Sequence, residues 1–107
     1  MVNIFMRLMV FFDLPVMTKT QRKAAANFRK FLIQNGFDML QYSVYSKITR
    51  NNDDMQKYIT MVDKNKPKEG SVRALSLTEV QYSRMIVMVG EKTATENYLE
   101  TKNILEF

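Results

Sequence analysis

A single apolar segment near the N-terminus limits the folds open to this chain. Residues 8–14 read LMVFFDL, and all of them except Asp13 are apolar. A short apolar run that is rich in aromatic side chains and followed by Pro15 predicts a strand buried on both faces. Asp13 then lies near the carboxyl end of this strand. Because burial of an unpaired carboxylate is costly, Asp13 either pairs with a basic residue or a turn amide, or emerges at a site that uses its charge.

The composition excludes several classes of enzyme. The 107 residues include no histidine and no cysteine, which rules out a Ser-His-Asp triad, a cysteine nucleophile and a His/Cys zinc site. Any chemistry must depend on carboxylates, lysine, tyrosine, serine or an oxygen-bound cation such as Mg²⁺. The net charge of +5 favours an anionic partner. The absence of cysteine, of a signal peptide and of an apolar run of membrane-spanning length predicts a cytoplasmic protein with no membrane partner.

A basic helix is predicted after the first strand. Thr18 and Gln21 form a capping-box pattern, and Asn35-Gly36 provides a C-cap. One face of the helix is apolar, and the opposite face carries five cations: Lys19, Arg22, Lys23, Arg29 and Lys30. Cations at helical spacing with no acid among them repel one another. The pattern is compatible with a merely solvated face, but it also favours contact with a polyanion.

Four further elements follow in sequence. Residues 37–48 alternate like a strand, and Ser43 marks a turn or bulge, so that one bent strand and two strands are both open. An amphipathic helix begins after Asn51 and ends before Pro67. Residues 71–79 and 84–89 read as two more strands, with a turn at 80–83 between them.

The predicted order is β-α-β-β-α-β with one added strand. This order predicts an α+β, ferredoxin-like domain over residues 1–90, with two helices on one face of an antiparallel sheet. The other face stays uncovered, which favours a homodimer with its sheets stacked face to face. Residues 91–107 form a C-terminal tail, in which 103–107 could add a strand for docking a partner.

Several local motifs resemble a known family. They are the strand end FDLP at residues 12–15, the NGF of residues 35–37, the QYSVY of residues 41–45 and the TEVQYSRMI of residues 78–86. In this order they resemble the second CRISPR-associated family, whose members are small adaptation proteins described as metal-dependent endonucleases or endoribonucleases. The block at 78–86 looks like the branch found with type II systems.

The resemblance implies a homodimer in which Asp13 meets Asp13 of a second copy. It also implies Mg²⁺ as the cofactor and the CRISPR integrase as a partner, with the dimer bridging two integrase dimers and lying along double-stranded spacer DNA. RNA is a second possible substrate. Arg22 matches a basic position of the family's first helix. Phe12 stands where the family often has tyrosine, Asp38 where it often has arginine, and Ser46 where it often has an acid.

Two functional hypotheses follow, and a third is weaker. In the first, the protein is a Mg²⁺-dependent phosphodiesterase with Asp13 as metal ligand and catalytic residue, and with Phe12 and Ser43 as site neighbours. In the second, it is a non-catalytic adaptor whose helix cations contact DNA phosphates, together with Lys47, Arg50, Arg73 and Arg84. The third, an RNA-recognition-type sheet, lacks the basic-glycine-aromatic signature on its third strand.

Overall fold

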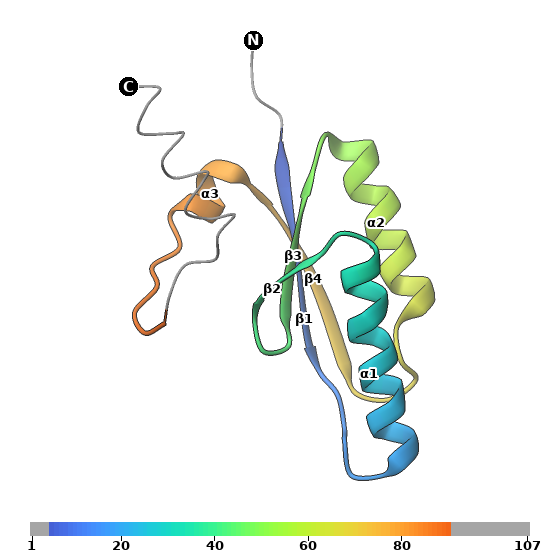
Figure 1. Ribbon diagram of the computed structural model, residues 1–107. Coiled ribbons are helices and arrows are strands. Elements are labelled where there is room, and N and C mark those ends of the chain that lie inside the picture. The colour runs from blue at the N-terminus through green and yellow to red at the C-terminus, as the bar shows by residue number, and fades with distance from the viewer. Residues whose placement is uncertain (1–4, 91–107) are drawn as a thin grey trace.

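The computed structural model describes residues 5–90 as one antiparallel sheet with helices packed on it (Figure 1). The strands are β1 (Met6–Asp13), β2 (Asp38–Gln41), β3 (Val44–Thr49) and β4 (Ser71–Thr78), in the spatial order β2-β3-β1-β4. Helices α1 (Lys19–Gln34) and α2 (Asn52–Asn65) lie side by side on one face, and the short α3 (Glu79–Ser83) lies on the other. No helix in this part of the chain is long and apolar enough to cross a membrane. The architecture confirms the predicted α+β, ferredoxin-like fold.

Strand β1 is the central element of the sheet. It pairs with β3 on one side and with β4 on the other, both antiparallel. Leu8 and Val10 are fully buried in the core under the helices. Because side chains alternate along a strand, Arg7 and Met9 face the opposite side, and they are buried too. The prediction of a strand buried on both faces is confirmed.

Helix α1 begins and ends where the sequence predicts. The Thr18 hydroxyl accepts a hydrogen bond from the Gln21 amide at 3.1 Å, and the Gln21 side chain accepts one from the Thr18 amide at 3.0 Å. Together they satisfy two amides that have no partner within the helix. At the other end, Gly36 has a φ of +86°, a backbone conformation that favours glycine. The apolar face packs on the sheet, so the cations of α1 are directed away from it.

Residues 37–48 form two strands rather than one bent strand. Strands β2 and β3 make a hairpin whose turn is Tyr42 and Ser43. Ser43 has a φ of +64°, which a non-glycine residue adopts only in a tight turn of this kind. The register shifts between Met39 and Gln41, so the hairpin also contains an irregularity before its turn.

The structure differs from the sequence prediction after β4. The expected turn at residues 80–83 is α3, which Thr78 and Gln81 cap at its start. Residues 84–89 form a turn and irregular backbone in the described chain and pair with neither β2 nor β4. The apolar pattern is that of a strand, but a strand needs a partner edge, and α3 directs the chain away from β4 (Figure 1). The predicted tail, residues 91–107, lies outside the described residues, as does its expected docking strand.

A buried arginine holds α3 against the sheet. The Arg7 side chain is 2% exposed, and its guanidinium donates to both carboxylate oxygens of Glu79, at 2.9 and 3.2 Å. The Tyr82 ring lies 4.0 Å from the guanidinium carbon. Bidentate pairing and cation–π contact satisfy a charge that the sheet would otherwise bury alone. These contacts fix the position of α3 on the sheet and therefore the point from which residues 84–90 continue.

Removing the carboxylate partner tests this role. Glu79→Gln is expected to lower the free energy of unfolding by about 2 kcal/mol, because Arg7 would stay buried without a counter-charge. Chemical denaturation at neutral pH measures the loss.

The matched control is Asp63→Asn on α2. Asp63 pairs with Lys66 at a similar distance, 2.8 Å, but both side chains are exposed. The hydrogen bond from Lys66 and its charge lower the pKa of the Asp63 carboxyl, yet exposed pairs contribute little to stability. Equal losses of unfolding free energy in Glu79→Gln and Asp63→Asn would contradict the expectation that burial makes the Arg7–Glu79 pair the more stabilising of the two.

Candidate functional site

Asp13 lines a shallow cavity at the carboxyl end of β1. The cavity has a volume of 290 Å³ and lies between the start of β4 and the β2–β3 turn. Its lining includes four residues singled out from the sequence, which are Phe12, Asp13, Ser43 and Arg73. Tyr42 completes the wall on the side of the hairpin turn. The fold therefore places the candidate carboxylate, a cation and a serine around one opening.

The sheet register explains why these residues meet. Phe11 pairs with Arg73 on one side and with Val44 on the other, and Asp13 pairs with Ser71. Since paired residues share a face of the sheet, Asp13 and Arg73 lie on the same face. The Phe12 amide also donates to the Ser43 carbonyl at 3.1 Å, which ties the hairpin turn to β1.

A glycine turn supports the backbone of Asp13. Gly70, just before β4, has a φ of +97°, and a Cβ atom there would lie 2.6 Å from the Asp13 carbonyl oxygen. Only glycine permits this close approach without a shift of the backbone. The ring of Phe12 points into the core, where its centroid lies 5.2 Å from that of Phe28 and 5.6 Å from that of Tyr45. Phe12 thus fixes the strand end and brings no polar group to the cavity.

The Asp13 carboxylate has no counter-charge among residues 5–90. It is exposed, and among residues 5–90 it accepts no hydrogen bond and forms no ion pair. Among the described residues Asp13 therefore pairs with neither a basic residue nor a turn amide, and it is exposed at the surface. The described residues contain no cluster of three or more acidic side chains that could hold a metal ion. The described part of one chain therefore offers a single carboxylate in this cavity. Mg²⁺ binds through one or two carboxylates together with substrate phosphates.

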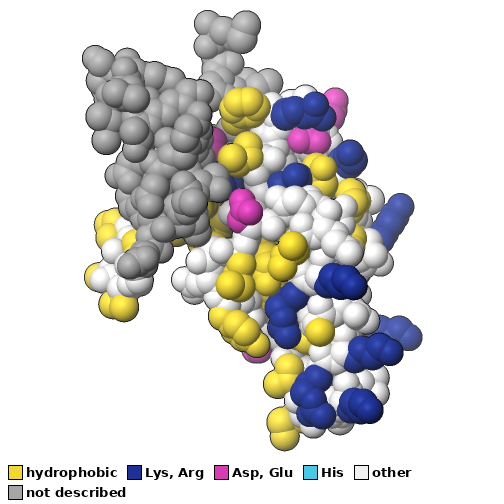
Figure 2. All heavy atoms as spheres, in the orientation of Figure 1, with side chains coloured by type: hydrophobic (Ala, Val, Ile, Leu, Met, Phe, Trp, Pro, Cys, Tyr) yellow, Lys and Arg dark blue, Asp and Glu magenta, His cyan; other side chains and the backbone are white. Residues whose placement is uncertain are grey.

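The cations of α1 lie on the helix layer, whereas Asp13 and Arg73 lie on the sheet face opposite to α1 and α2. Lys19, Arg22, Lys23 and Lys30 are exposed, and Figure 2 shows lysine and arginine side chains gathered over α1 and α2. Arg22 has a second role, because its guanidinium donates to the carbonyl oxygens of Val16 and Met17 in the loop before α1. Four of the five cations predicted on the first helix are thus exposed on the surface of the molecule.

Arg29 differs from the other four cations in its burial and in its contact with an aromatic ring. It is half-buried, and its guanidinium carbon lies 5.6 Å from the centroid of the Tyr42 ring. This contact connects the basic surface of α1 to the hairpin turn that borders the cavity.

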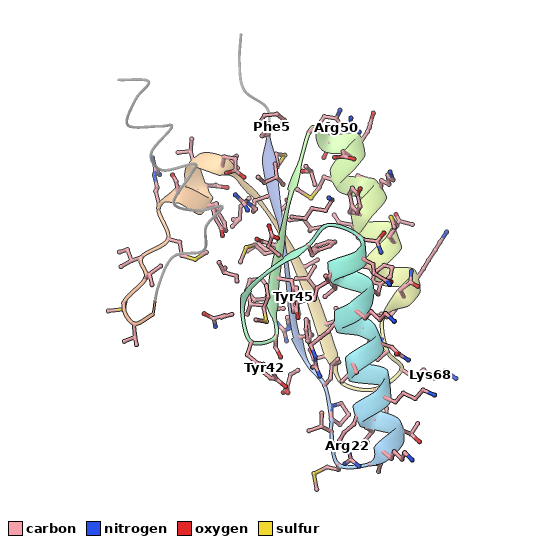
Figure 3. All side chains as sticks on the ribbon, viewed as in Figure 1. Phe5, Arg22, Tyr42, Tyr45, Arg50 and Lys68 are labelled. Atoms are coloured by element: carbon pink, nitrogen blue, oxygen red, sulfur yellow. The ribbon has the colours of Figure 1, made fainter. Side chains whose placement is uncertain are left out.

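The structure does not bring all of the predicted phosphate contacts together. Lys47 is half-buried on β3, with its ammonium 4.5 Å from the centroid of the Tyr58 ring. Arg50 lies at the opposite end of the molecule from Arg22 (Figure 3) and pairs loosely with Asp54 at 3.7 Å. Arg84 is exposed just after α3, away from α1. These three positions do not belong to the surface that α1 forms.

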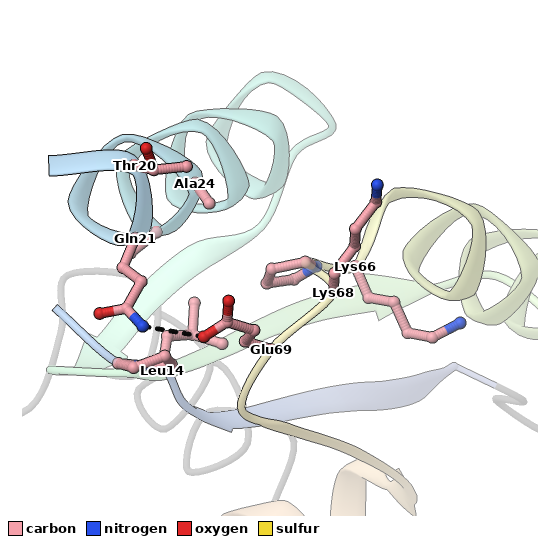
Figure 4. A pocket seen from close by; sticks show the side chains of 10 residues that line it. Leu14, Thr20, Gln21, Ala24, Lys66, Lys68 and Glu69 are labelled. Carbon is pink, nitrogen blue, oxygen red and sulfur yellow. Dashed lines mark hydrogen bonds between the residues drawn. The ribbon is translucent and has the colours of Figure 1, made fainter. Parts of the chain in front are cut away.

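A second cavity lies near the start of α1. It has a volume of 390 Å³ and lies between the first turns of α1 and the loop that follows α2. The Gln21 side chain donates to the Glu69 carboxylate at 2.8 Å across one side of it (Figure 4). This bond joins α1 to the turn before β4 and so supports the position of Asp13. None of the catalytic or metal-binding candidates lines this cavity.

Sequence reasoning assigns no role to two residues, Tyr42 on the rim of the cavity and Arg7 beneath α3. Tyr42 belongs to the QYSVY motif, but its exposure follows from the hairpin turn that the structure shows. Arg7 was passed over because it precedes the apolar run, and its partner Glu79 is 72 residues away along the chain.

Comparison with known proteins agrees with the geometry. The family described as CRISPR associated protein Cas2 matches residues 6–85. A protein of Acidovorax ebreus named CRISPR-associated endoribonuclease Cas2 is 43% identical over 102 residues, which cover 95% of this chain and all of the relative. The protein of the same name from Treponema denticola is 48% identical over 96 residues, covering 90% of this chain and 93% of the relative. The chain belongs to the CRISPR-associated protein Cas2 family.

Proposed function

We propose that this protein acts in CRISPR adaptation, the acquisition of spacers. In this proposal a homodimer binds double-stranded spacer DNA, bridges the CRISPR integrase and carries a Mg²⁺-dependent phosphodiesterase activity centred on Asp13. The observation that carries the catalytic part is the exposed and unneutralised carboxylate beside Arg73. The relatives named as endoribonucleases support nuclease chemistry, with RNA as a second candidate substrate.

Asp13 and Asp13 of a second copy would together hold the metal ion. The donor set fits Mg²⁺ in type, since the carboxylate is free and the cavity is open to solvent, but one chain supplies too few ligands. A twofold axis passing near Asp13 would supply the second carboxylate. Bound Mg²⁺ would lower the pKa of a coordinated water and stabilise charge on the phosphate.

The chain's own residues would position the substrate. Arg73 lies on the same sheet face as Asp13, where its guanidinium can hold a phosphate oxygen by paired hydrogen bonds. Ser43 borders the same cavity and offers a hydroxyl as a further polar contact. The α1 cations would bind other phosphates of the same nucleic acid and so fix the position of the nucleic-acid strand on the protein.

Asp13→Asn tests the catalytic assignment. The variant is expected to lose Mg²⁺-dependent cleavage of RNA and DNA by at least roughly 100-fold, because an amide cannot replace the anionic ligand. Cleavage of labelled oligonucleotides with and without Mg²⁺ measures the loss. Asp38→Asn, which changes an exposed acid on β2 outside the cavity, is the matched control. Equal cleavage by Asp13→Asn and the wild type would remove Asp13 from the active site.

Adaptation without catalysis is the second candidate function. It is favoured by the single carboxylate of each described chain, together with the extended basic surface over α1 and α2. Integrase-assisted spacer insertion separates the two candidates when it is measured with Asp13→Asn. If cleavage is lost and insertion is intact, catalysis does not serve adaptation.

The α1 surface should contribute directly to the salt dependence of DNA binding. Lys23 and Lys30 are exposed and, unlike Arg22, do not support the loop before α1. Replacing both with alanine should weaken binding to duplex DNA and flatten the slope of log K against log salt by about 1.8, since each phosphate contact contributes about 0.9. Titrations at several salt concentrations measure the slope. The neutral control Asn27→Ala on the same helix should leave the salt slope unchanged. An unchanged slope in the double variant would mean that Lys23 and Lys30 face solvent and do not contact DNA phosphates.

The sheet face opposite to α1 and α2 is the proposed dimer interface. Leu75 on β4 is 49% exposed, and it shares this face with Met9, its partner across the strands. Beyond α3, Ile86 and Met88 are exposed as well. Stacking of two such faces would remove this apolar surface from water. The cytoplasmic setting expected from the absence of cysteine is compatible with such a partner-dependent role.

Charge placed on this face should prevent dimerisation. The wild type is expected to sediment as a dimer and Leu75→Glu as a monomer, because the substitution would bury a carboxylate in the interface. Ile33→Glu is the control, since Ile33 is equally apolar and exposed but lies on α1. A dimeric Leu75→Glu variant would place the interface elsewhere.

A further inference from the structure

Tyr42 is an exposed aromatic side chain that the proposed function does not use. It lies at the tip of the β2–β3 hairpin (Figure 3), and 73% of its surface is exposed. The ring gains little stability from burial, and it lies on the rim of the Asp13 cavity. The ring is large, flat and next to a carboxylate that is poised for phosphate chemistry.

The ring is held in place from two directions. The Ser43 backbone has a φ of +64°, and its carbonyl accepts a hydrogen bond from the Phe12 amide, which fixes the turn against β1. On the other side, the Arg29 guanidinium lies 5.6 Å from the centroid of the ring. A ring that is ordered before a ligand arrives loses little conformational entropy when it binds.

The surroundings of the ring match one class of ligand. A nucleobase stacks on an aromatic ring whatever its identity, and a guanidinium next to the ring can bind the phosphate of the same nucleotide. Inside a duplex each base is stacked on its neighbours on both faces, so an interior paired base cannot stack on an aromatic side chain, whereas an unpaired base can. The exposed cations of α1 would meanwhile bind phosphates of the paired region.

We propose that Tyr42 and Arg29 form a platform for an unpaired nucleotide beside Asp13. The preferred ligand is a nucleic acid with a single-stranded end, whose terminal base stacks on Tyr42 while its backbone passes Asp13. This inference rests on the proposed nucleic-acid binding and adds the choice of strand structure. It also assigns a specificity-determining role to the hairpin turn.

Binding without catalysis tests the platform. Wild type, Tyr42→Ala and Tyr42→Phe are titrated in EDTA with two fluorescent probes, a blunt DNA duplex and the same duplex carrying single-stranded thymidine ends. Wild type should bind the probe with single-stranded ends more tightly. Tyr42→Ala should lose roughly 5- to 100-fold in affinity for that probe, the amount that one base–aromatic stack contributes, and keep its affinity for the blunt duplex. Tyr42→Phe, which keeps the ring, should bind both probes like wild type.

Other outcomes overturn the platform. Equal losses on both probes, no loss on either, or a wild type that prefers the blunt duplex would each exclude it while leaving the proposed DNA binding intact. A change from dimer to monomer in Tyr42→Ala, measured by sedimentation, would assign the ring to a protein interface instead. Failure of the wild type to bind either probe would overturn the proposed function as well. Because the ring is exposed, Tyr42→Ala is expected to unfold at the wild-type temperature, which circular dichroism checks.

Discussion

The burial of β1 between two antiparallel neighbours determines much of the remaining structure. Both faces of the strand are covered, so each charged residue on it must be paired or must lie at an end. Arg7, near the start, is enclosed and receives the Glu79 carboxylate and the Tyr82 ring. Asp13, at the end, is exposed and has no partner among the described residues. The two charged residues of β1 therefore have different surroundings. Arg7 holds α3 against the sheet, and Asp13 stays exposed to solvent.

The sequence predicts the parts of the fold that local chemistry controls. The caps at Thr18 and Asn51, the apolar run of β1 and the glycine after α1 involve residues only a few positions apart, and the structure confirms each of them. The path after β4 could not be predicted in this way, because it depends on a bond between Arg7 and Glu79 across 72 residues. An apolar pattern at 84–89 shows that a segment can form a strand, but pairing requires a free edge that only the folded chain defines.

The same distinction applies to the candidate site. Asp13 stands out in the sequence because a lone carboxylate in an apolar strand is unusual, and Arg73 stands out only as one cation among many. Their proximity follows from the β1–β4 register, in which Phe11 pairs with Arg73. Tyr42 becomes notable only once the hairpin turn places its ring on the rim of the cavity. Sequence reasoning thus finds a residue such as Asp13, whose charge is unusual among its sequence neighbours. Residues such as Arg73 and Tyr42, which reach the site only through strand pairing and the hairpin turn, are found only from the structure.

The free carboxylate also constrains how two copies can associate. If a twofold axis brings Asp13 close to Asp13 of a second copy, the two negative charges raise the energy of the dimer unless a cation or a proton lies between them. Arg73 lies on the same face and could reduce this repulsion, although its guanidinium forms no ion pair with Asp13 in the single chain. A divalent cation bound between the carboxylates would then stabilise the dimer by mass action, in addition to any role in cleavage. Metal binding and dimer stability would be linked at this one strand end, so that even a non-catalytic adaptor would have a physical reason to keep Asp13.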